Sequence, residues 1–425
     1  MKKIIEHILK RLAADVLRKY KPYIIGVTGS MGKTSTKEAI FAVLGTRFSV
    51  RRNVKNYNNE IGVPLTILGE ESGGRSPLRW LFIFLKALKI IFFKTKYPEI
   101  LILEMGADKP GDIKYLMSFV NPNIGVITGI GEIPVHVEFF KSSVQVAREK
   151  AGLIEFLEKE DFAILNFDDK LVKGMATKTQ AKILSYGFDE AADVRATGYE
   201  INITLDPVLS GIGFKIEYDG KNLWFKKEGI FGEHQVYPIL SAYAVGLALN
   251  MNLAEIFEGL KAYMPPRGRL QMIEGIKSSW ILDDTYNASP AATISALETL
   301  AKFEGRRRIA VLGDMLELGE FTESAHRLIG EKVSECADYF FAVGERMQFA
   351  AEAANKKGMK KQKVFWFETA DGARMPLQMI MQKGDVILIK GSQSMRMEKI
   401  VEEIMAHPEM AGELLVRQEE KWKKI

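Results

Sequence analysis

One stretch constrains the fold of this chain more than any other, because a strand pattern, a glycine turn and a helix pattern follow one another in it. Residues 23–28 form a short apolar run, and T-G-S-M-G-K-T occupies positions 28–34. Residues 34–44 are mostly compatible with helix. A strand that turns through glycines into a helix presents backbone N–H groups to an anion, so we predict a phosphate-binding loop here.

The loop departs at one position from the usual G-x-x-x-x-G-K-[ST] pattern, because Val27 stands where the first glycine would be. In sites of this kind the lysine adds positive charge at the phosphates and the next hydroxyl binds Mg2+, which are the roles we assign to Lys33 and Thr34. The order of strand, turn and helix favours this site over a plain glycine-rich turn. The predicted ATP contacts of the loop are Thr28, Gly29, Ser30, Met31, Gly32, Lys33, Thr34 and Ser35.

The rest of the chain shows two α/β patterns. Strand-like and helical segments alternate from residue 23 to about residue 167, which indicates a parallel sheet with helices on its faces, and an antiparallel extension with a hairpin turn at Asp219-Gly220 follows. Pro265 and Pro266 interrupt the pattern before a second alternation begins. We predict an α/β protein with an N-terminal amphipathic helix (1–22), a central parallel-sheet ATP-binding domain (23–264) and a Rossmann-like C-terminal domain (265–425).

Composition excludes several classes of function. A chain of 425 residues with 47% hydrophobic and 27% charged residues is typical of a globular protein of two or three domains. The single cysteine, Cys336, rules out an internal disulfide framework and fits a reducing compartment, so we expect a cytoplasmic protein. The net charge of +5 is spread along the chain, so we expect no nucleic-acid partner, whereas small anionic substrates are compatible.

The apolar segment 78–93 needs a separate interpretation. It is shorter than a bilayer span and carries Arg79, Lys86 and Lys89, so we reject a transmembrane helix. Two readings stay open: a helix that packs on the sheet or at a subunit contact, which is the more common use of such a stripe, or a basic, aromatic-rich helix that lies on a membrane surface.

Several polar residues follow strands in the first predicted domain. Glu104 ends the strand at 100–105, at the sheet edge where open α/β sheets bind ligands and where a phosphate-bound Mg2+ needs a carboxylate. His136 follows the next strand; a lone histidine is more often structural, but its loop leaves the same edge. Lys150 lies on the following helix, where a surface lysine is the ordinary reading. The amide-rich segment 56–64 suits a turn or a polar ligand, and its candidate substrate contacts are Asn56, Asn58 and Asn59.

The second predicted domain repeats this arrangement. Asp284, Tyr286 and Asn287 follow a strand and precede a helix, and Gly313-Asp314-Met315 and Lys390-Gly391-Ser392 follow later strands. Since the carboxyl ends of parallel strands share one edge of a sheet, these loops predict a ligand site at a cleft between the domains.

Together these motifs resemble those of the Mur ligase family and are most similar to its MurF-type class. The segments that carry the resemblance occur in the family's order: T-G-S-M-G-K-T-S-T-K-E, N-Y-N-N-E-I-G-V-P, E-M-G-A-D, H-V-E-F-F-K-S, P-R-G-R, D-D-T-Y-N-A-S-P, G-D-M-L-E-L-G-E with His326 after it, and K-G-S. The resemblance extends from about residue 23 to about residue 406.

The resemblance implies an ATP-dependent amide ligase of peptidoglycan precursor synthesis, which joins D-Ala-D-Ala or a similar dipeptide to a muramyl peptide through an acyl phosphate. It implies that Thr34 and Glu104 bind one Mg2+, that His136 binds a second, and that Lys150 is carbamylated and so able to bind metal. It implies that Lys33, His136 and Lys150 are catalytic. The nucleotide contacts that it implies in the second domain are Arg269, Asp284, Tyr286 and Asn287.

Three features depart from the MurF-type pattern. About 22 residues precede the phosphate loop, so we expect the class's N-terminal UDP-binding domain to be absent. Gln235 and Pro238 interrupt the family's G-x-H-N-x-x-N motif, and Gly152 replaces a frequent glutamate. Two other functions stay open: a folylpolyglutamate-synthase-like ligase that acts on another carboxylate, and a nucleotide-binding module without catalysis. We expect a monomer.

Overall fold

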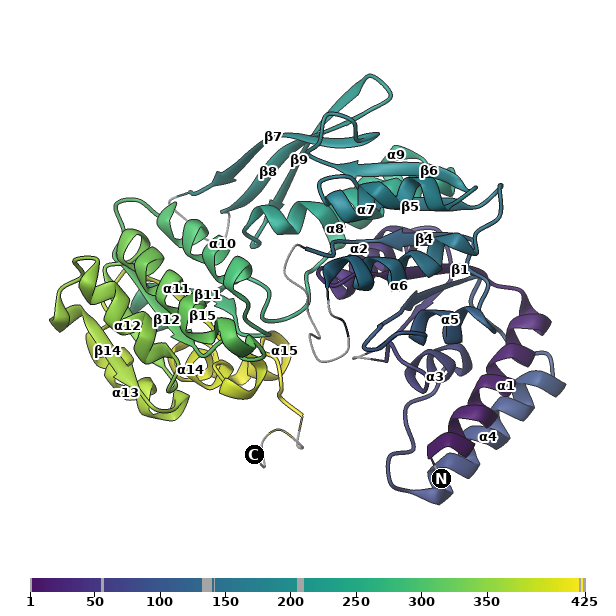
Figure 1. Cartoon of the computed structure of the whole chain (residues 1–425), viewed down its shortest axis with the longest axis horizontal. Helices are drawn as coiled ribbons and strands as arrows, with labels where there is room; N and C mark the ends of the chain where they lie inside the picture. Colours follow the sequence, from purple (N-terminus) through teal and green to yellow (C-terminus); the bar gives the residue numbers. More distant parts are fainter. Residues whose placement is uncertain are drawn as a thin grey trace. The chain divides into compact units, whose positions relative to one another are not determined.

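The computed structural model describes residues 2–54, 57–131, 140, 142–204, 210–419 and 422. These residues form two compact units, and both are α/β structures, which confirms the predicted fold class (Figure 1). Unit 1 comprises Met1–Gly198, Phe214–Phe225 and His234–Met264, and unit 2 comprises Tyr199–Gly213, Lys226–Glu233 and Pro265–Ile425.

A nine-stranded sheet runs through unit 1 in the order β2-β3-β1-β4-β5-β6-β7-β8-β9, and the outer parts of β7, β8 and β9 belong to unit 2. All neighbouring pairs from β2 to β6 are parallel, and Val27 on β1 lies opposite Glu104 on β3. The strands are β1 (Tyr23–Thr28), β2 (Val50–Arg52), β3 (Ile100–Glu104), β4 (Ile124–Ile127), β5 (Phe162–Asn166), β6 (Lys182–Gly187), β7 (Val194–Asn202), β8 (Gly211–Tyr218) and β9 (Lys221–Glu228).

The predicted antiparallel extension is correct only in part. β6 pairs in parallel with β5, because α7 (Lys170–Lys173) and the turn after it carry the chain back along the sheet, as a parallel connection requires. The hairpin prediction is confirmed, since β8 and β9 are neighbours joined by Asp219 and Gly220 with φ of 49° and 72°. Two consecutive positive φ angles are typical of the tight turn that joins twisted strands.

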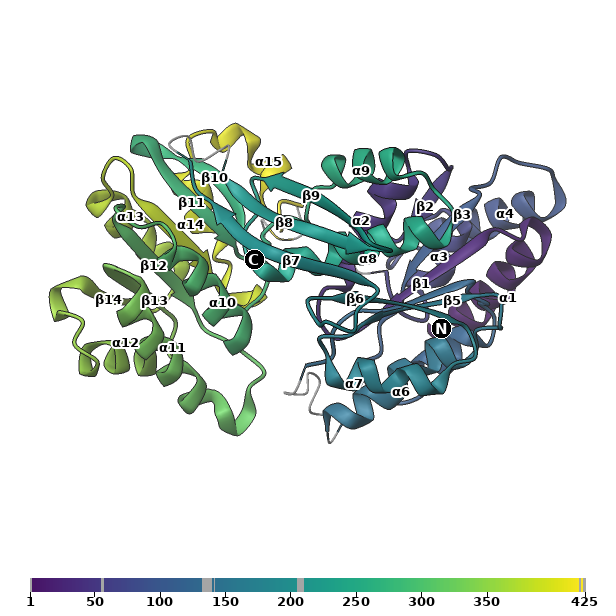
Figure 2. The ribbon, with the colours of Figure 1, turned by 90° about the horizontal axis from the view of Figure 1, so that it is seen from above.

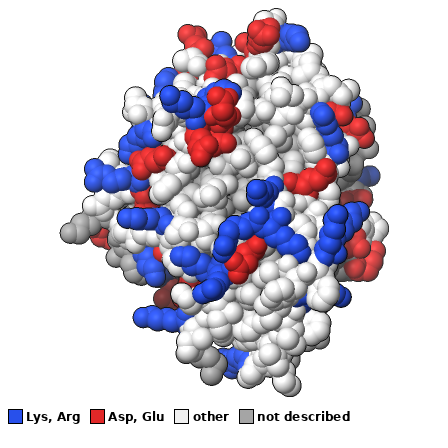
Figure 3. All heavy atoms as spheres, turned by 90° about the vertical axis from the view of Figure 1, so that its right-hand side faces the viewer, with Lys and Arg blue, Asp and Glu red and all other residues white. Residues whose placement is uncertain are grey.

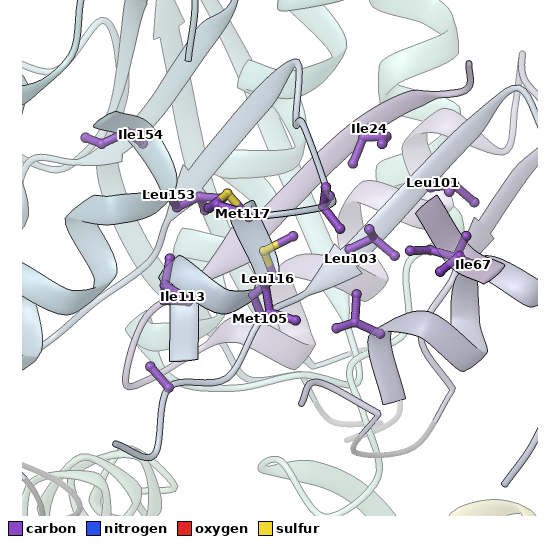
Figure 4. Close-up of a cluster of buried hydrophobic side chains, with 14 of the residues drawn as sticks. Ile24, Ile67, Leu101, Leu103, Met105, Ile113, Leu116, Met117, Leu153 and Ile154 are labelled. Atoms are coloured by element: carbon purple, nitrogen blue, oxygen red, sulfur yellow. The ribbon is translucent and has the colours of Figure 1, made fainter. Parts of the chain in front are cut away.

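Helices cover both faces of the sheet in unit 1. Figure 2 shows α2 and α9 on one face and α6 and α7 on the other. The face of α6 holds a core to which Ile24, Leu101 and Leu103 contribute alternate strand residues, and Ile113 and Leu153 contribute helix residues (Figure 4). The helices are α1 (Lys2–Tyr20), α2 (Lys33–Leu44), α3 (Gly62–Leu68), α4 (Pro77–Phe92), α5 (Asp112–Met117), α6 (Ser143–Glu155), α7 (Lys170–Lys173), α8 (Val236–Ala248) and α9 (Leu253–Ala262).

The chain begins with α1, whose apolar residues at helical spacing are buried against α3 and α4. Leu9, Ala13 and Val16 form this buried stripe, and the opposite side of α1 carries charged residues. Within the described residues, no helix combines the length and the apolarity needed to cross a bilayer.

Unit 2 contains a six-stranded sheet in the order β10-β11-β15-β12-β13-β14. Only β10, which was not predicted, is antiparallel to its neighbour. Separate apolar cores lie on the two faces, one with α10, α11 and α12 and the other with α13 and α14. The elements are β10 (Gln271–Gly275), β11 (Ser279–Asp284), α10 (Pro290–Ala301), β12 (Arg308–Gly313), α11 (Thr322–Cys336), β13 (Tyr339–Val343), α12 (Met347–Lys356), β14 (Val364–Phe367), α13 (Ala370–Ile380), β15 (Val386–Lys390), α14 (Glu398–Ile404) and α15 (Ala411–Leu414).

Candidate active site

The predicted phosphate loop connects β1 to α2 through two glycines with positive φ. Gly29 has φ of 150° and Gly32 has φ of 77°, and Gly32 is the residue before the first turn of α2. A Cβ atom at Gly29 would lie 1.9 Å from Thr128 Oγ1, so only glycine fits there. The first turn of a helix leaves its N–H groups without intrahelical partners, which suits an anion at this end of α2.

The loop is attached to the residues that follow β4. The N–H groups of Ser30 and Met31 donate to Gly129 O at 2.7 and 3.0 Å, and Thr128 Oγ1 donates to Met31 O at 2.5 Å. Ser30 Oγ is buried and has no hydrogen-bond partner among the described residues. An orphaned hydroxyl in a loop of this shape fits a phosphate oxygen, so the residues present fit the triphosphate of a nucleotide.

Thr34 and Glu104, which were predicted to share a metal, lie together in the structure. Thr34 Oγ1 and Asn58 Nδ2 both donate to Glu104 Oε1 at 3.3 Å. A hydroxyl and a carboxylate side by side are the hard oxygen donors that Mg2+ prefers, so this pair fits the ion. Within the described residues, no group of three or more His, Cys, Asp or Glu could hold a metal. Phosphate oxygens and water are the further ligands that Mg2+ commonly takes beside one or two protein oxygens.

Two buried residues behind this pair were not predicted. Lys37 Nζ lies 3.5 Å from Glu104 Oε2 and donates to Asn53 O at 2.9 Å. Asn53 Oδ1 in turn accepts from the Glu104 N–H at 2.6 Å. Lys37 therefore holds the Glu104 carboxylate, and Asn53 holds the Glu104 backbone. The signal for Lys37 was its position one helical turn after Lys33, on the same face of α2.

Lys150 is a buried side chain of α6, so the surface reading is wrong. Burial, with the positive charge of Lys33 as a second cause, lowers the pKa of Lys150 to about 7. The carboxylates of Asp108, Glu149 and Asp112 act in the opposite direction without restoring the ordinary value. A large part of the Lys150 amines is therefore neutral near pH 7.

Two predicted site residues lie outside the described residues, namely His136 and Asn56. The start of the His136 loop is nevertheless defined, because Asp169 Oδ2 accepts from the N–H groups of Ile130 and Gly131 at 2.6 and 2.9 Å. Asn59 Oδ1 accepts from Ile61 and Gly62 at 3.2 and 2.9 Å, where α3 begins. The substrate role assigned to Asn59 stays a prediction.

In unit 2, the predicted residues Asp284 and Asn287 gather around Lys390. Lys390 Nζ donates to Asp284 Oδ2 at 2.6 Å and to Asn287 O at 2.9 Å, and both charged side chains are buried. Arg269 lies over the Tyr286 ring with its guanidinium carbon 4.2 Å from the ring centroid. These residues thus form one polar group at the end of β11 and β15, and their contact with a nucleotide stays a prediction.

His326 and Asp314, which belong to the G-D-M-L-E-L-G-E motif region, serve the structure of unit 2. His326 Nδ1 donates to Thr322 O at 2.6 Å, and His326 Nε2 accepts from the Met315 N–H at 3.1 Å. Burial lowers the pKa of His326, in agreement with a neutral ring that makes both bonds. Asp314 accepts from the Met347 N–H at 2.8 Å, where α12 begins.

The strand, glycine loop and helix of unit 1, with an acid at the end of the adjacent parallel strand, define a nucleotide-phosphate-binding α/β protein of the P-loop type. Comparison with protein families gives a narrower assignment. Residues 27–76 and 85–246 match the Mur ligase middle domain, and residues 268–393 match the Mur ligase, glutamate ligase domain. The chain belongs to the Mur ligase family, as the sequence motifs indicated, and is therefore an ATP-dependent ligase of the acid–amino-acid class.

Several individual proteins and solved structures that resemble this chain belong to one class of the family. The chain is 32% identical over 403 residues to the UDP-N-acetylmuramoyl-tripeptide--D-alanyl-D-alanine ligase of Bacillus subtilis (strain 168), covering 94% of this chain and 79% of that protein. It is similar to the structure of MurF from Acinetobacter baumannii, with a TM-score of 0.76, 25% identity and coverage of 92% and 79%. It is also similar to the MurF ligase of Thermotoga maritima in complex with ADP, with a TM-score of 0.74, 26% identity and coverage of 94% and 83%.

Proposed function

We propose that this protein is a MurF-type ligase that joins D-alanyl-D-alanine, or a similar dipeptide, to the terminal carboxylate of a muramyl peptide. A carboxylate oxygen of the acceptor attacks the γ-phosphorus of ATP, and the bond to ADP breaks to give an acyl phosphate. The amine of the dipeptide then attacks the acyl carbon and loses a proton. The tetrahedral intermediate expels inorganic phosphate and leaves an amide.

The phosphate loop supports the proposed binding of ATP and the transfer of its γ-phosphate. The N–H groups at the start of α2 and the ammonium of Lys33 hold the triphosphate and stabilise the negative charge that moves during transfer. Thr34 Oγ1 and Glu104 would hold Mg2+, which would neutralise negative charge at the phosphates. Lys37 contacts the Glu104 carboxylate on the side of Oε2, and Asn53 fixes the Glu104 backbone at the end of β3.

The environment of Lys150 supports the proposed carbamylation of its side chain, because a neutral buried amine is the form that adds carbon dioxide. The neutral amine nitrogen bonds to the carbon of CO2 and releases one proton, which converts the amine into an anionic carbamate. Counted from the protonated lysine, two protons leave, so a cation near Lys33 is replaced by an anion. The repulsion between Lys33 and Lys150 becomes attraction. The new carboxylate and His136 would together hold a metal ion, which would stabilise negative charge on the substrates. A carbamate signal from 13C-bicarbonate, present in the natural chain and absent in Lys150→Met, is the expected NMR result.

Substrate and nucleotide contacts are proposed outside the phosphate loop as well. Asn56, Asn58 and Asn59 are proposed substrate contacts, and Arg269, Asp284, Tyr286 and Asn287 are proposed nucleotide contacts of unit 2. We propose a cytoplasmic monomer that acts on small molecules and not on nucleic acid. The folylpolyglutamate-synthase-like alternative is not favoured, because relatives at about a third identity over most of the chain carry the MurF name.

The observation that carries the proposal is the meeting of Thr34 Oγ1 and Glu104 Oε1 at 3.3 Å beside the loop of Lys33. The test is a phosphate-release assay with ATP, Mg2+, UDP-MurNAc-tripeptide and D-Ala-D-Ala, each omitted in turn. Release that requires all four, with the joined product seen by mass spectrometry, is expected. Equal release without the dipeptide, or release only with another amino acid, would contradict the assignment.

A further inference from the structure

Helix α4 (Pro77–Phe92) has two apolar faces, and the fold buries only one of them. Trp80, Ile83 and Ala87 are buried against unit 1, where α4 packs beside α1. An apolar face of a helix in a globular protein is normally covered by other parts of the fold. The outward face of α4 is therefore not explained by the packing of unit 1.

The outward face carries a continuous apolar stripe at helical spacing. Phe82, Leu85 and Phe92 are 63%, 56% and 75% exposed, and they are separated by three and seven residues. Single exposed apolar residues are ordinary on a protein surface, whereas a row along one helix marks an interaction site. The exposed members of this stripe are Leu78, Leu81, Phe82, Leu85, Leu88, Phe92 and Phe93.

The ends of α4 are held firmly, so the stripe is fixed in orientation. Lys19 Nζ on α1 donates to Ile90 O, Ile91 O and Phe93 O at 2.8, 2.9 and 2.6 Å, which satisfies the last turn of α4. At the other end, the Trp80 Nε1–H donates to Gly74 O at 3.1 Å. The stripe is thus presented by a rigid helix and not by a loose segment.

The charged residues within the segment that carries the stripe are all basic. Residues 72–98 contain six Lys or Arg and no Asp or Glu, namely Arg75, Arg79, Lys86, Lys89, Lys94 and Lys96. Lys86 and Arg79 form ion pairs with Glu70 and Glu71 just before this segment, so part of the charge is balanced locally. Figure 3, a view from the side where α1 and α4 lie in Figure 1, shows a charge-free area in its lower part with Lys and Arg beside it.

The first half of α4 also lies outside the matched family domain, because the Mur ligase middle domain matches residues 27–76 and resumes at residue 85. The common core of the family therefore does not account for residues 77–84. This segment includes Leu78, Leu81 and Phe82, which are members of the stripe.

We propose that α4 docks this protein on a membrane surface that contains anionic lipids. The stripe lies at the boundary between headgroups and acyl chains, and the flanking Lys and Arg contact lipid phosphates. The helix lies in the plane of the membrane, since 16 residues span only about 24 Å and the flanks are charged. The proposal goes beyond the ligase activity and does not depend on it.

The charge pattern favours lipid over a second copy of this chain. A symmetric dimer would place the same patch of both copies face to face, so the Lys and Arg of one copy would meet those of the other. An anionic bilayer instead supplies the opposite charge and an apolar layer beneath it.

The test is co-sedimentation of the full chain with vesicles of phosphatidylglycerol and phosphatidylcholine, without nucleotide or substrate. Binding that weakens with salt, and that weakens on vesicles of phosphatidylcholine alone, is expected. Phe82→Ser with Leu85→Ser should lower the partition coefficient at least tenfold. The matched control is Phe321→Ser with Leu328→Ser, two residues of similar exposure in unit 2, which should leave binding unchanged.

A second pair of variants tests the charge. Lys89→Glu with Lys94→Glu should abolish the preference for phosphatidylglycerol, whereas Lys356→Glu with Lys357→Glu should keep it. Unchanged melting temperatures would show that all variants fold. Equal binding by the two serine pairs would overturn the proposal. So would a dimer, seen by light scattering, that Phe82→Ser with Leu85→Ser converts to monomer while no variant or natural chain binds vesicles.

Discussion

The ammonium of Lys37 lies 3.5 Å from Glu104 Oε2, and these two side chains are only 1% and 4% exposed. Lys37 lies on α2, one turn after the phosphate loop, and Glu104 ends β3. The pair therefore joins the helix that begins at the loop to the strand that ends at the predicted metal site. The same ion pair therefore contributes to the stability of unit 1 and to the position of the carboxylate at the predicted metal site.

Replacing Lys37 by Met should destabilise unit 1 by about 3 kcal/mol, because the substitution leaves a buried carboxylate without its cation. Urea unfolding followed by circular dichroism measures the change. The double variant Lys37→Met with Glu104→Gln should lose less, because no buried charge is left. If the double variant lost as much as the single one, the ion pair would not be the cause.

Lys33→Met should lower kcat/KM about 10²- to 10³-fold, because the variant loses the cation at the phosphates, while the melting temperature stays the same. The matched control is Lys360→Met, an exposed lysine of unit 2, which should keep full activity. A Lys33→Met variant with near-normal turnover would remove the loop from the mechanism.

The buried amine of Lys150 predicts a pH dependence of stability. Its folded-state pKa of about 7 lies below its ordinary value, so between pH 7 and about pH 10.5 the unfolded chain binds more protons at this site than the folded chain. The free energy of unfolding therefore rises with pH across this range and levels off below about pH 7. Burial of the Lys150 ammonium therefore lowers the free energy of unfolding at neutral pH, and this loss disappears at high pH.

Lys150→Met removes this group and should flatten the rise. Urea unfolding of both proteins in CO2-free buffer at pH 7 and pH 9.5 gives the comparison. Relative to the variant, the natural chain should be less stable at pH 7 and should approach the variant at pH 9.5. A constant difference between the two proteins would contradict the lowered pKa.

Gly29→Ala should distort the phosphate loop, since its Cβ would lie 1.9 Å from Thr128 Oγ1 and its φ of 150° is one that alanine rarely adopts. We expect at least a tenfold loss of ATP affinity by calorimetry. Gly74→Ala, another glycine with positive φ but with open space around its Cβ position, is the matched control and should keep its affinity. Equal affinities in the two variants would refute the steric argument.

The local features of the site could be predicted from the sequence. The sequence order of strand, glycines and Lys33-Thr34 defines the loop by itself, and Glu104 could be placed because parallel strands end at a common edge. The bounds of β1 agree with the predicted apolar run at residues 23–28, because this run is compact and a glycine turn follows it. Strand β10 was not predicted, since it is short and follows an irregular segment.

Features that depend on tertiary packing could not be predicted. Lysine is usually a surface residue, so the sequence does not show that Lys37 is buried. Only the folded chain brings Asn53 and Glu104 to its ammonium group. Lys150 was predicted to be a surface residue for the same reason, whereas its position on α6 buries its side chain. The apolar segment at 78–93 left two interpretations open, because a sequence does not show which face of α4 the rest of unit 1 covers.

The most direct test of the account is the fate of the acceptor's carboxylate oxygen. Acceptor labelled with 18O in its terminal carboxylate is turned over with ATP and D-Ala-D-Ala, and the released phosphate is analysed by 31P NMR. The account predicts one 18O atom in each phosphate, because the acyl phosphate carries that oxygen away. Phosphate without label would contradict activation of the carboxylate by phosphoryl transfer.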